Sequence, residues 1–284
     1  MAWFSRSPVV PVLRLSGAIG MASPLRPGLS LAALAGPIEK AFSMSRSDAV
    51  AVTVNSPGGS PVQSHLVFRR IRQLATEKKK RVFVFCEDVA ASGGYFLALA
   101  GDEIFVDPSS IVGSIGVISA SFGFTKAIDR LGIERRVYTS GQSKSFLDPF
   151  LPEQEADVER LRAVQREVHD AFISVVKERR GEKLKAPDHE LFTGAFWSGP
   201  RALELGLVDG ISDVRSRMRE LYGDKVRLRA VPLSSGGLFA RLRRAPGLEG
   251  VAAATAGVPD FSHGLADGII GALDERALWA RYGL

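Results

Sequence analysis

The chain has 284 residues, of which 45% are hydrophobic and 24% charged, an ordinary balance for a globular protein that argues against wholesale disorder. Its one cysteine, Cys86, excludes an intrachain disulfide framework and any paired-cysteine motif, and its four histidines lack metal-ligand spacing, so we expect no metal site. No apolar run reaches the roughly 18 residues of a membrane span, and prolines interrupt the N-terminal run, which favours a cytoplasmic protein.

Apolar, β-branched runs in the N-terminal third predict three strands that are buried within one sheet. They cover Val9–Leu15, Ala49–Val54 and Arg81–Cys86. Between the first two, Pro37 predicts the start of a helix, because proline suits the first helical position. Before the third, the pattern S-x-x-Q that begins at Ser60 predicts a capping box and a second helix.

Short elements continue to alternate up to about residue 140. This alternation predicts an α/β fold with a mostly parallel sheet and crossover helices. The expected elements are a turn at Glu87–Ala91, a helix at Ser92–Ala100, strands at Glu103–Val106 and Gly116–Ser119, a helix at Phe124–Leu131 and a strand at Glu134–Tyr138.

The pattern changes after Pro149. An acidic start and a basic end predict one long helix across residues 152–181, whose apolar face packs either on a partner chain or on its own sheet. Residues 194–211 contain a second capped helix, with Pro200 near its start and Gly206 at its end.

A Gly-, Ala-, Pro- and Ser-rich stretch at 234–262 predicts a linker or an extended arm, and Leu265–Leu284 predicts an amphipathic helix. We therefore expect a main domain at residues 1–233 and a C-terminal arm with its helix at 234–284.

The net charge of +6 is concentrated in one segment. Nine Lys and Arg residues but only two acidic residues lie between Arg215 and Arg244, and Leu238, Phe239 and Leu242 are interleaved with the arginines. This segment predicts weak contact with an anionic membrane surface, or else a face that is merely solvated. No nucleic-acid motif accompanies it, so we expect no nucleic-acid partner.

Two glycine-rich turns follow buried strands, one at residues 55–59 and one at 91–94. The carboxyl ends of parallel strands line the crevice where such sheets bind ligands. Glycine lets the backbone approach a substrate, and Ser92 at a helix start lies beside unpaired N–H donors that favour an oxyanion. The plainer alternatives are a helix N-cap for Ser92 and a tight turn for Gly58 and Gly59.

A nucleophilic serine needs a base. No histidine occurs between residues 66 and 168, and we interpret His65 and His169 as surface or core histidines. A lysine can replace histidine if burial keeps it neutral, and Lys144 follows a predicted strand. From its local sequence alone, Lys144 would be a solvated loop residue.

Over residues 9 to 222 the sequence resembles the signal peptide peptidase A family of serine proteases, in its short, single-core form. Four motifs in the same order carry the resemblance: NSPGGSPVQS (55–64), DVAASGGYFLALAGDEIFVDPSSIVGSIGVI (88–118), SGQSKSFLDPF (140–150) and WSGPRALELGLVD (197–209).

The resemblance implies a Ser-Lys dyad. Ser92 matches the family nucleophile, Lys144 the general base, and Ser114 a serine whose hydroxyl holds the lysine amine. Gly59 and Gly93 match the backbone donors of the oxyanion hole. The implied fold is crotonase-like, as in the Clp protease proteolytic subunit, with repeated β-β-α units that assemble into a ring or dome of identical subunits.

The expected function is therefore a serine endopeptidase that cleaves signal-peptide remnants or other short or unfolded peptides through an acyl-enzyme, without a metal or other cofactor. Two alternatives remain open. A crotonase-fold acyl-CoA enzyme would share the glycine oxyanion donors but would not need Ser92, Ser114 and Lys144. A non-catalytic, membrane-associated scaffold would need none of the five site residues.

Overall fold

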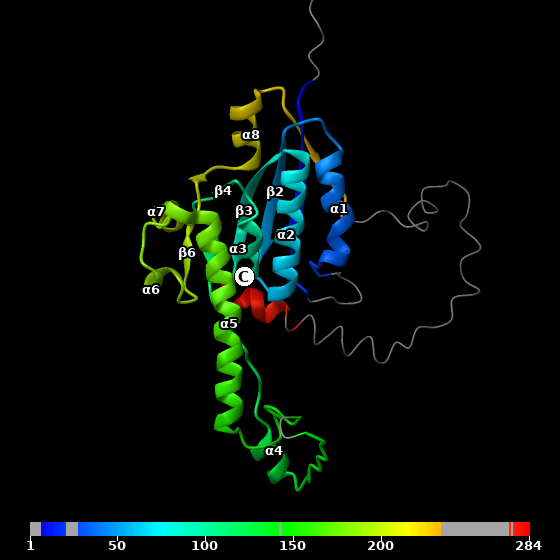
Figure 1. The fold of residues 1–284 in the computed structure, drawn as a ribbon, viewed down its shortest axis with the longest axis vertical. Helices are drawn as coiled ribbons and strands as arrows, with labels where there is room; N and C mark the ends of the chain where they lie inside the picture. The colour runs from blue at the N-terminus through cyan, green and yellow to red at the C-terminus, as the bar shows by residue number, and fades with distance from the viewer. Residues whose placement is uncertain (1–6, 21–27, 142–143, 234–272, 274) are drawn as a thin grey trace, which may run out of the picture.

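The computed structural model describes residues 7–20, 28–141, 144–233, 273 and 275–284 (Figure 1). Within these ranges eight strands form one sheet, in the order β6-β5-β3-β2-β1-β8, with β4 beside the first half of β3 and β7 beside β4. Every strand pair is parallel except β5 with β6. The strands are β1 (Val9–Ser16), β2 (Ala49–Ser56), β3 (Arg81–Ala91), β4 (Glu103–Val106), β5 (Ile111–Gly113), β6 (Phe196–Ser198), β7 (Gly210–Ile211) and β8 (Arg227–Ala230).

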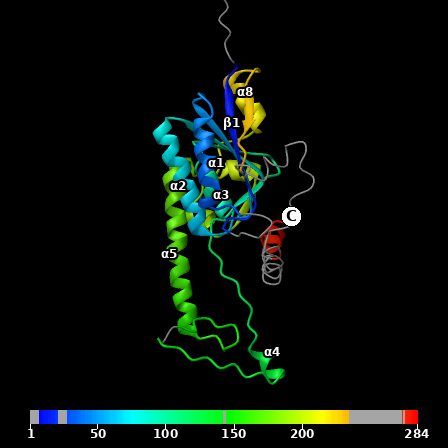
Figure 2. The ribbon, with the colours of Figure 1, turned by 90° about the vertical axis from the view of Figure 1, so that its right-hand side faces the viewer.

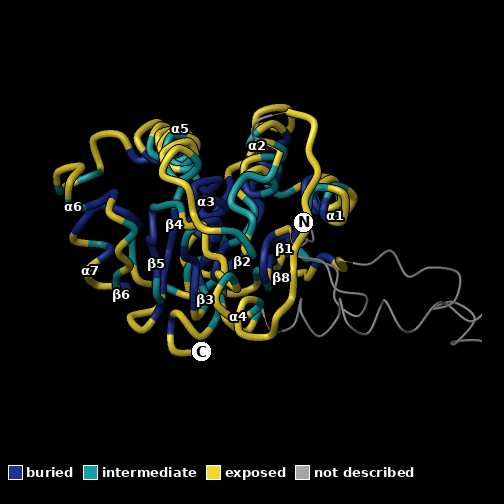
Figure 3. Tube along the Cα trace, turned by 90° about the horizontal axis from the view of Figure 1, so that it is seen from below, coloured by how far each residue is buried: buried dark blue, intermediate teal, exposed yellow. Residues whose placement is uncertain are grey.

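Helices cover both faces of this sheet (Figures 2 and 3). The larger core lies under α1, α2, α3 and α5, and a second core joins Met218 of α8 to Phe83, Phe85 and Phe105 on the other face. The α/β prediction is therefore confirmed. The helices are α1 (Leu31–Ser43), α2 (Pro61–Lys78), α3 (Gly93–Ala98), α4 (Thr125–Arg130), α5 (Glu155–Arg180), a 3-10 turn at Gly181–Lys183, α6 (Asp188–Leu191), α7 (Gly199–Glu204) and α8 (Val214–Tyr222).

The long strand β3 replaces a predicted turn. Its first half pairs with β4 and its second half, Val89–Ala91, pairs with β5. Asn55 bridges the register shift between β2 and β3, because its side chain donates to Asp88 at 2.7 Å and accepts from the N–H of Val89 at 3.1 Å. The expected turn at Glu87–Ala91 is thus wrong.

Helix α1 begins six residues before the predicted start. Ser30 caps it by accepting from the N–H of Ala33 at 3.3 Å, and Pro37 lies inside the helix. Burial of Leu34 and Ile38 at helical spacing outweighs the backbone hydrogen bond that proline cannot make.

Two further predicted strands are absent from the described residues. Gly116–Ser119 lies outside regular structure, since the edge of β3 is already occupied by Ile111–Gly113. Glu134–Tyr138 is likewise irregular, and Tyr138 is 92% exposed. Glu134–Tyr138 belongs to the projecting segment, residues 118–141 and 144–154, which carries α4 and extends away from the sheet (Figures 1 and 2).

The predicted long helix is α5, and of the two expected packing modes the structure shows the one on its own sheet. Phe172 and Val176 in its C-terminal half are buried against the sheet, while Val164 in its N-terminal half is 52% exposed. The predicted arm at 234–262 lies outside the described residues, as do Leu238, Phe239 and Leu242 and residues 265–272 and 274 of the predicted terminal helix.

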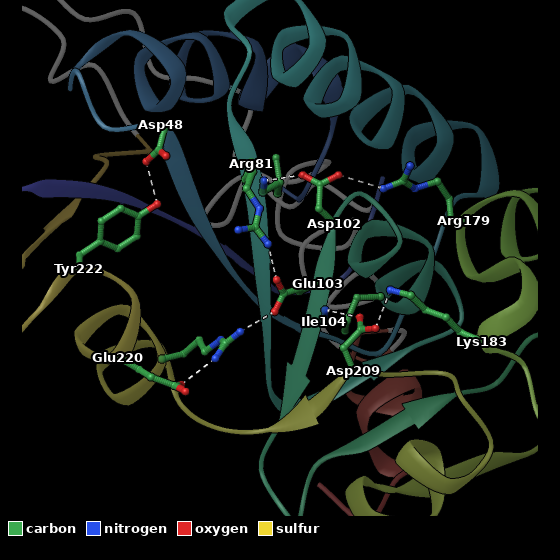
Figure 4. Close-up of polar contacts among 12 residues, drawn as sticks. Asp48, Arg81, Asp102, Glu103, Ile104, Arg179, Lys183, Asp209, Glu220 and Tyr222 are labelled. Carbon is green, nitrogen blue, oxygen red and sulfur yellow. Dashed lines mark hydrogen bonds and ion pairs between the residues drawn. The ribbon is translucent and has the colours of Figure 1, made fainter.

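Asp209 fastens α5 to the sheet (Figure 4). Its carboxylate accepts from the N–H of Ile104 at 2.8 Å and from Arg180 and Lys183 at 2.7 Å each. Burial alone would raise the pKa of Asp209, but the hydrogen bonds from the two cations lower the pKa below its ordinary value. This anchor fixes the C-terminal half of α5 on the sheet, and with it the helical wall of the site described next.

Candidate active site

Two glycine-containing turns meet at the carboxyl edge of the sheet. Gly58 and Gly59 follow β2, and Ser92 and Gly93 follow β3. A Cβ on Gly58 would lie 2.8 Å from the Cβ of Ser92 and 2.9 Å from the nitrogen of Gly93, and Gly58 has a φ of +102°. Only glycine therefore fits at position 58 without displacing Ser92. The two turns form one site.

Ser92 has a backbone conformation that residues with a side chain rarely adopt, with φ 53° and ψ −122°. Its N–H donates to the carbonyl of Gly113 at 2.8 Å, which holds the peptide in place. Ser92 occupies the N-cap position of α3, yet its side chain makes no capping hydrogen bond. Capping therefore does not explain this serine, whereas strained residues of this kind concentrate at functional sites.

Ser114 lies beside Ser92 because of the strand register. Ala91 of β3 is paired with Gly113 of β5, and the two serines follow these residues. Ser114 also has a positive φ, 52°, and is 8% exposed. Its hydroxyl accepts a hydrogen bond from the hydroxyl of Tyr282 at 3.3 Å.

The backbone supplies two donors next to Ser92. The N–H groups of Gly59 and Gly93 make no hydrogen bond within the described ranges, although the adjacent Ser60 N–H donates to Ile19 at 2.8 Å. Gly59, Ser92 and Gly93 line one pocket. Unpaired N–H groups beside a serine hydroxyl in a pocket are the components of an oxyanion hole.

The pocket has a volume of about 340 Å³ and is mostly apolar. Helices α2, α3 and α5 build its walls. They contribute Val62 and His65, Phe96, and Val168 and Phe172, respectively. The rings of Phe96 and Phe172 are 4.9 Å apart, so they close one side of the pocket. A space of this size and polarity suits an apolar side chain.

Ser114 follows the strand pair beside Ser92 without lining the pocket, and Lys144 is the one predicted site residue that lies apart from the others. It is exposed, lies on the projecting segment and is not among the pocket-lining residues. Its backbone N–H donates to the carbonyl of Gly141 at 3.3 Å. Ser92, Gly93, Gly59 and Ser114 therefore gather at one edge of the sheet, without Lys144 of the same chain.

The histidines and the cysteine, which are the alternative bases and nucleophile, have structural contacts or burial that explain their positions. The Nε2 of His169 lies 3.1 Å from the carbonyl oxygen of Ile115 and ties α5 to the loop after β5. His65 packs against Phe96, with the ring centres 5.7 Å apart. Burial raises the pKa of the Cys86 thiol to about 12, so this cysteine is not a thiolate nucleophile at neutral pH.

Tyr282 is the contact that the sequence analysis missed. It is separated from Ser114 by 168 positions, and no local motif links the two residues. Only the packing of the C-terminal residues on the sheet brings them together.

Several known proteins are similar to this chain in sequence. The sequence model of Peptidase family S49 matches residues 74–226. A Brucella abortus protein named Na(+)/H(+) antiporter NhaA is 54% identical over 276 residues, which are 97% of this chain and 37% of that protein. The chloroplastic serine protease SPPA of Arabidopsis thaliana is 26% identical over 227 residues, 78% of this chain and 31% of that protein. A protein of Buchnera aphidicola named probable protease SohB is 33% identical over 177 residues, 61% of this chain and 52% of that protein.

The chain thus spans little more than a third of the length of the Brucella relative. Among the described residues, no helix combines the length and the apolar character that crossing a membrane requires. Ser92, Ser114 and Lys144 all lie within the part of the chain that matches the family model.

Proposed function

This chain belongs to Peptidase family S49, whose sequence model covers more than half of it, and on that premise we propose that it is a serine endopeptidase with a Ser92-Lys144 dyad. Its sheet with crossover helices agrees with the crotonase-like fold. The observation that carries the proposal is Ser92, which is held at a positive φ in a pocket with two unpaired N–H donors. We take residues 1–233 as the catalytic domain and 234–284 as an arm.

The proposed reaction has two halves. The Ser92 oxygen attacks the scissile carbonyl carbon while neutral Lys144 takes the hydroxyl proton, and the Gly59 and Gly93 N–H groups stabilise the oxyanion. Each such donor is worth about 3–4 kcal/mol in comparable sites. Lys144 then gives its proton to the leaving amine. In the second half Lys144 deprotonates a water, which attacks the acyl carbon; the ester bond to the Ser92 oxygen then breaks, and Lys144 gives the proton back to that oxygen.

The exposed position of Lys144 supports a dyad that is completed between subunits. The projecting segment that carries it exposes large apolar side chains, among them Phe122 at 78% and Leu131 at 73%. Several large apolar side chains exposed on one segment are typical of an interface. We infer that the projecting segment of one copy packs on a neighbouring copy, so that Lys144 meets the neighbour's Ser92 and Ser114. A homo-oligomeric ring or dome satisfies this arrangement.

The pocket beside Ser92 supports a preference for an apolar residue on the acyl side of the cleaved bond. Phe96, Val168 and Phe172 offer apolar surface, and the space of about 340 Å³ admits side chains from alanine to leucine. Short or unfolded peptides, including signal-peptide remnants, are the proposed substrates because they present such residues in an extended chain.

A location at the cytoplasmic membrane surface completes the proposal. The Brucella relative is named as an antiporter, a class of membrane protein. In this chain Arg215 and Arg219 of α8, with Lys225, Arg227 and Arg229 beyond it, are exposed. Such residues add about 1 kcal/mol each near an anionic surface.

Labelling with a fluorophosphonate tests the nucleophile. We expect wild-type protein to be modified at Ser92, and Ser92→Ala to lose both labelling and peptide hydrolysis. Ser109→Ala, which changes an exposed serine away from the pocket, is the matched control and should label normally. Modification of wild-type protein at another residue, or unchanged hydrolysis by Ser92→Ala, refutes the assignment.

A further inference from the structure

The C-terminal residues Glu275–Leu284 pack against the sheet on the side opposite to α1, α2 and α5 (Figure 3). Tyr282 is 8% exposed and packs in one apolar cluster with Val89 and Ala91 at the end of β3. It meets the ring of Phe196 edge-on, with 5.3 Å between the ring centres. Tyr282 is thus held by packing on several sides, and its hydroxyl is fixed at Ser114.

We propose that Tyr282 is a positioning residue for the Ser114 hydroxyl and thereby for the base of the dyad. The inference rests on the proposed function, in which Ser114 holds the amine of Lys144. It extends the site beyond the part of the chain that matches the family model, which ends at residue 226.

The argument starts from the hydroxyl of Ser114. A serine hydroxyl has one proton and two lone pairs, and it rotates freely unless a partner fixes it. The backbone N–H of Ser114 donates to the carbonyl of Ala195 at 2.7 Å and holds the backbone in place. The orientation of the Ser114 hydroxyl is therefore what remains to be fixed. The Tyr282 proton occupies one lone pair of Ser114. The hydrogen bond from Tyr282 therefore sets the directions in which the second lone pair and the proton of the Ser114 hydroxyl point.

A fixed Ser114 hydroxyl matters for a lysine base. The lone pair of the neutral amine must face Ser92, so the amine N–H groups need acceptors in fixed positions. The second lone pair of Ser114 is such an acceptor. Tyr282 leaves it free, because it uses only one of the three hydrogen-bonding positions of Ser114. The tyrosine therefore orients the base without competing with it, in the way that outer residues orient a metal ligand.

Tyr282→Phe tests the inference in the full chain. The phenylalanine keeps the ring and its contacts with Phe196 but removes the hydroxyl. We expect kcat to fall about threefold to tenfold, the range that one hydrogen bond between neutral groups is worth, with KM unchanged. Tyr222→Phe is the matched control, because it removes a hydroxyl that bonds Asp48 at 2.8 Å outside the pocket, and it should leave kcat unchanged.

A double-mutant cycle separates positioning from packing. In a Ser114→Ala background, we expect Tyr282→Phe to have no further effect, because the partner hydroxyl is already gone. The rate of Ser92 labelling by a fluorophosphonate provides the readout if turnover of the Ser114→Ala protein is too slow to measure.

Three results overturn the inference alone while hydrolysis still depends on Ser92. The kcat of Tyr282→Phe could equal that of wild type, or it could be higher, as expected if the Tyr282 contact blocks Lys144. Alternatively, Tyr282→Phe could lower the rate by the same factor in the wild-type and the Ser114→Ala backgrounds. Hydrolysis that survives Ser92→Ala refutes the proposed function instead, and the inference falls with it.

Discussion

Gly58→Ala adds one methyl group where the two turns of the site touch. The new Cβ would lie 2.8 Å from the Cβ of Ser92, 2.9 Å from the nitrogen of Gly93 and 3.1 Å from the carbonyl oxygen of Ala91. Real Cβ atoms do not tolerate the two shorter distances, so the turn after β3 must move. The φ of +102° adds backbone strain for any residue other than glycine.

The cost has two parts. A residue forced into a rare backbone region loses about 1–3 kcal/mol of stability, and overpacking of a tight contact adds about 1–3 kcal/mol. Gly223→Ala isolates the first part, because Gly223 has a φ of +82° but no atom within 4 Å of its added Cβ. We therefore expect Gly58→Ala to be destabilised by about 2–6 kcal/mol and Gly223→Ala by only about 1–3 kcal/mol.

Activity should separate the two variants further. Movement of Ser92 by a few tenths of an ångström should reduce kcat about 10-fold to 100-fold in Gly58→Ala, whereas Gly223→Ala should hydrolyse peptides at the wild-type rate. Denaturant unfolding and a fluorogenic peptide assay, both on the folded variants, provide the two measurements. A Gly58→Ala protein with wild-type kcat and no more destabilisation than Gly223→Ala would refute the close contact between the turns.

Three other predictions concern assembly, the membrane and pH. Light scattering should show an oligomer for wild type and a smaller species for Phe122→Glu, which places a charge in the exposed apolar surface; a monomeric, active wild type contradicts this. Co-sedimentation with anionic vesicles should be weak and lost at high salt, and equal, negligible binding to anionic and neutral vesicles at low salt contradicts the membrane proposal. Because the pKa of Asp209 is lowered on folding, its stabilising contribution is present above the unfolded pKa and is lost as pH falls through the folded value. Asp209→Asn should therefore be less stable than wild type at neutral pH, and this difference should shrink in acid; a constant difference would contradict the assigned ion pair.

The local sequence was sufficient to predict the helices whose first residues form their own caps. Ser60 caps α2 as predicted, since its hydroxyl accepts from the N–H of Gln63 at 3.4 Å. The side chain of Gln63, however, accepts from the N–H of Leu31 at 2.9 Å and links α2 to the start of α1 instead of completing the capping box. Long-range partners of this kind leave no trace in a local pattern.

The same limit applies to the candidate site. The motifs singled out Ser92 and Ser114, but their proximity depends on the pairing of Ala91 with Gly113, which only the sheet register determines. The predicted turn before Ser92 became strand because β5 offered β3 a second partner. Tyr282 could not be predicted, because its role requires the C-terminal residues to return to β3 and β5.

Complementation between two inactive variants tests the central claim most directly. Ser92→Ala retains Lys144, and Lys144→Ala retains Ser92, so each alone should be inactive. If the dyad forms between copies, co-expression that mixes them randomly should restore about a quarter of wild-type activity, because both contributing copies must carry the intact residue. The mixed assembly should also be labelled by fluorophosphonate at Ser92. A mixture as inactive as its components would contradict a dyad shared between subunits, and activity of Lys144→Ala alone would contradict the dyad itself.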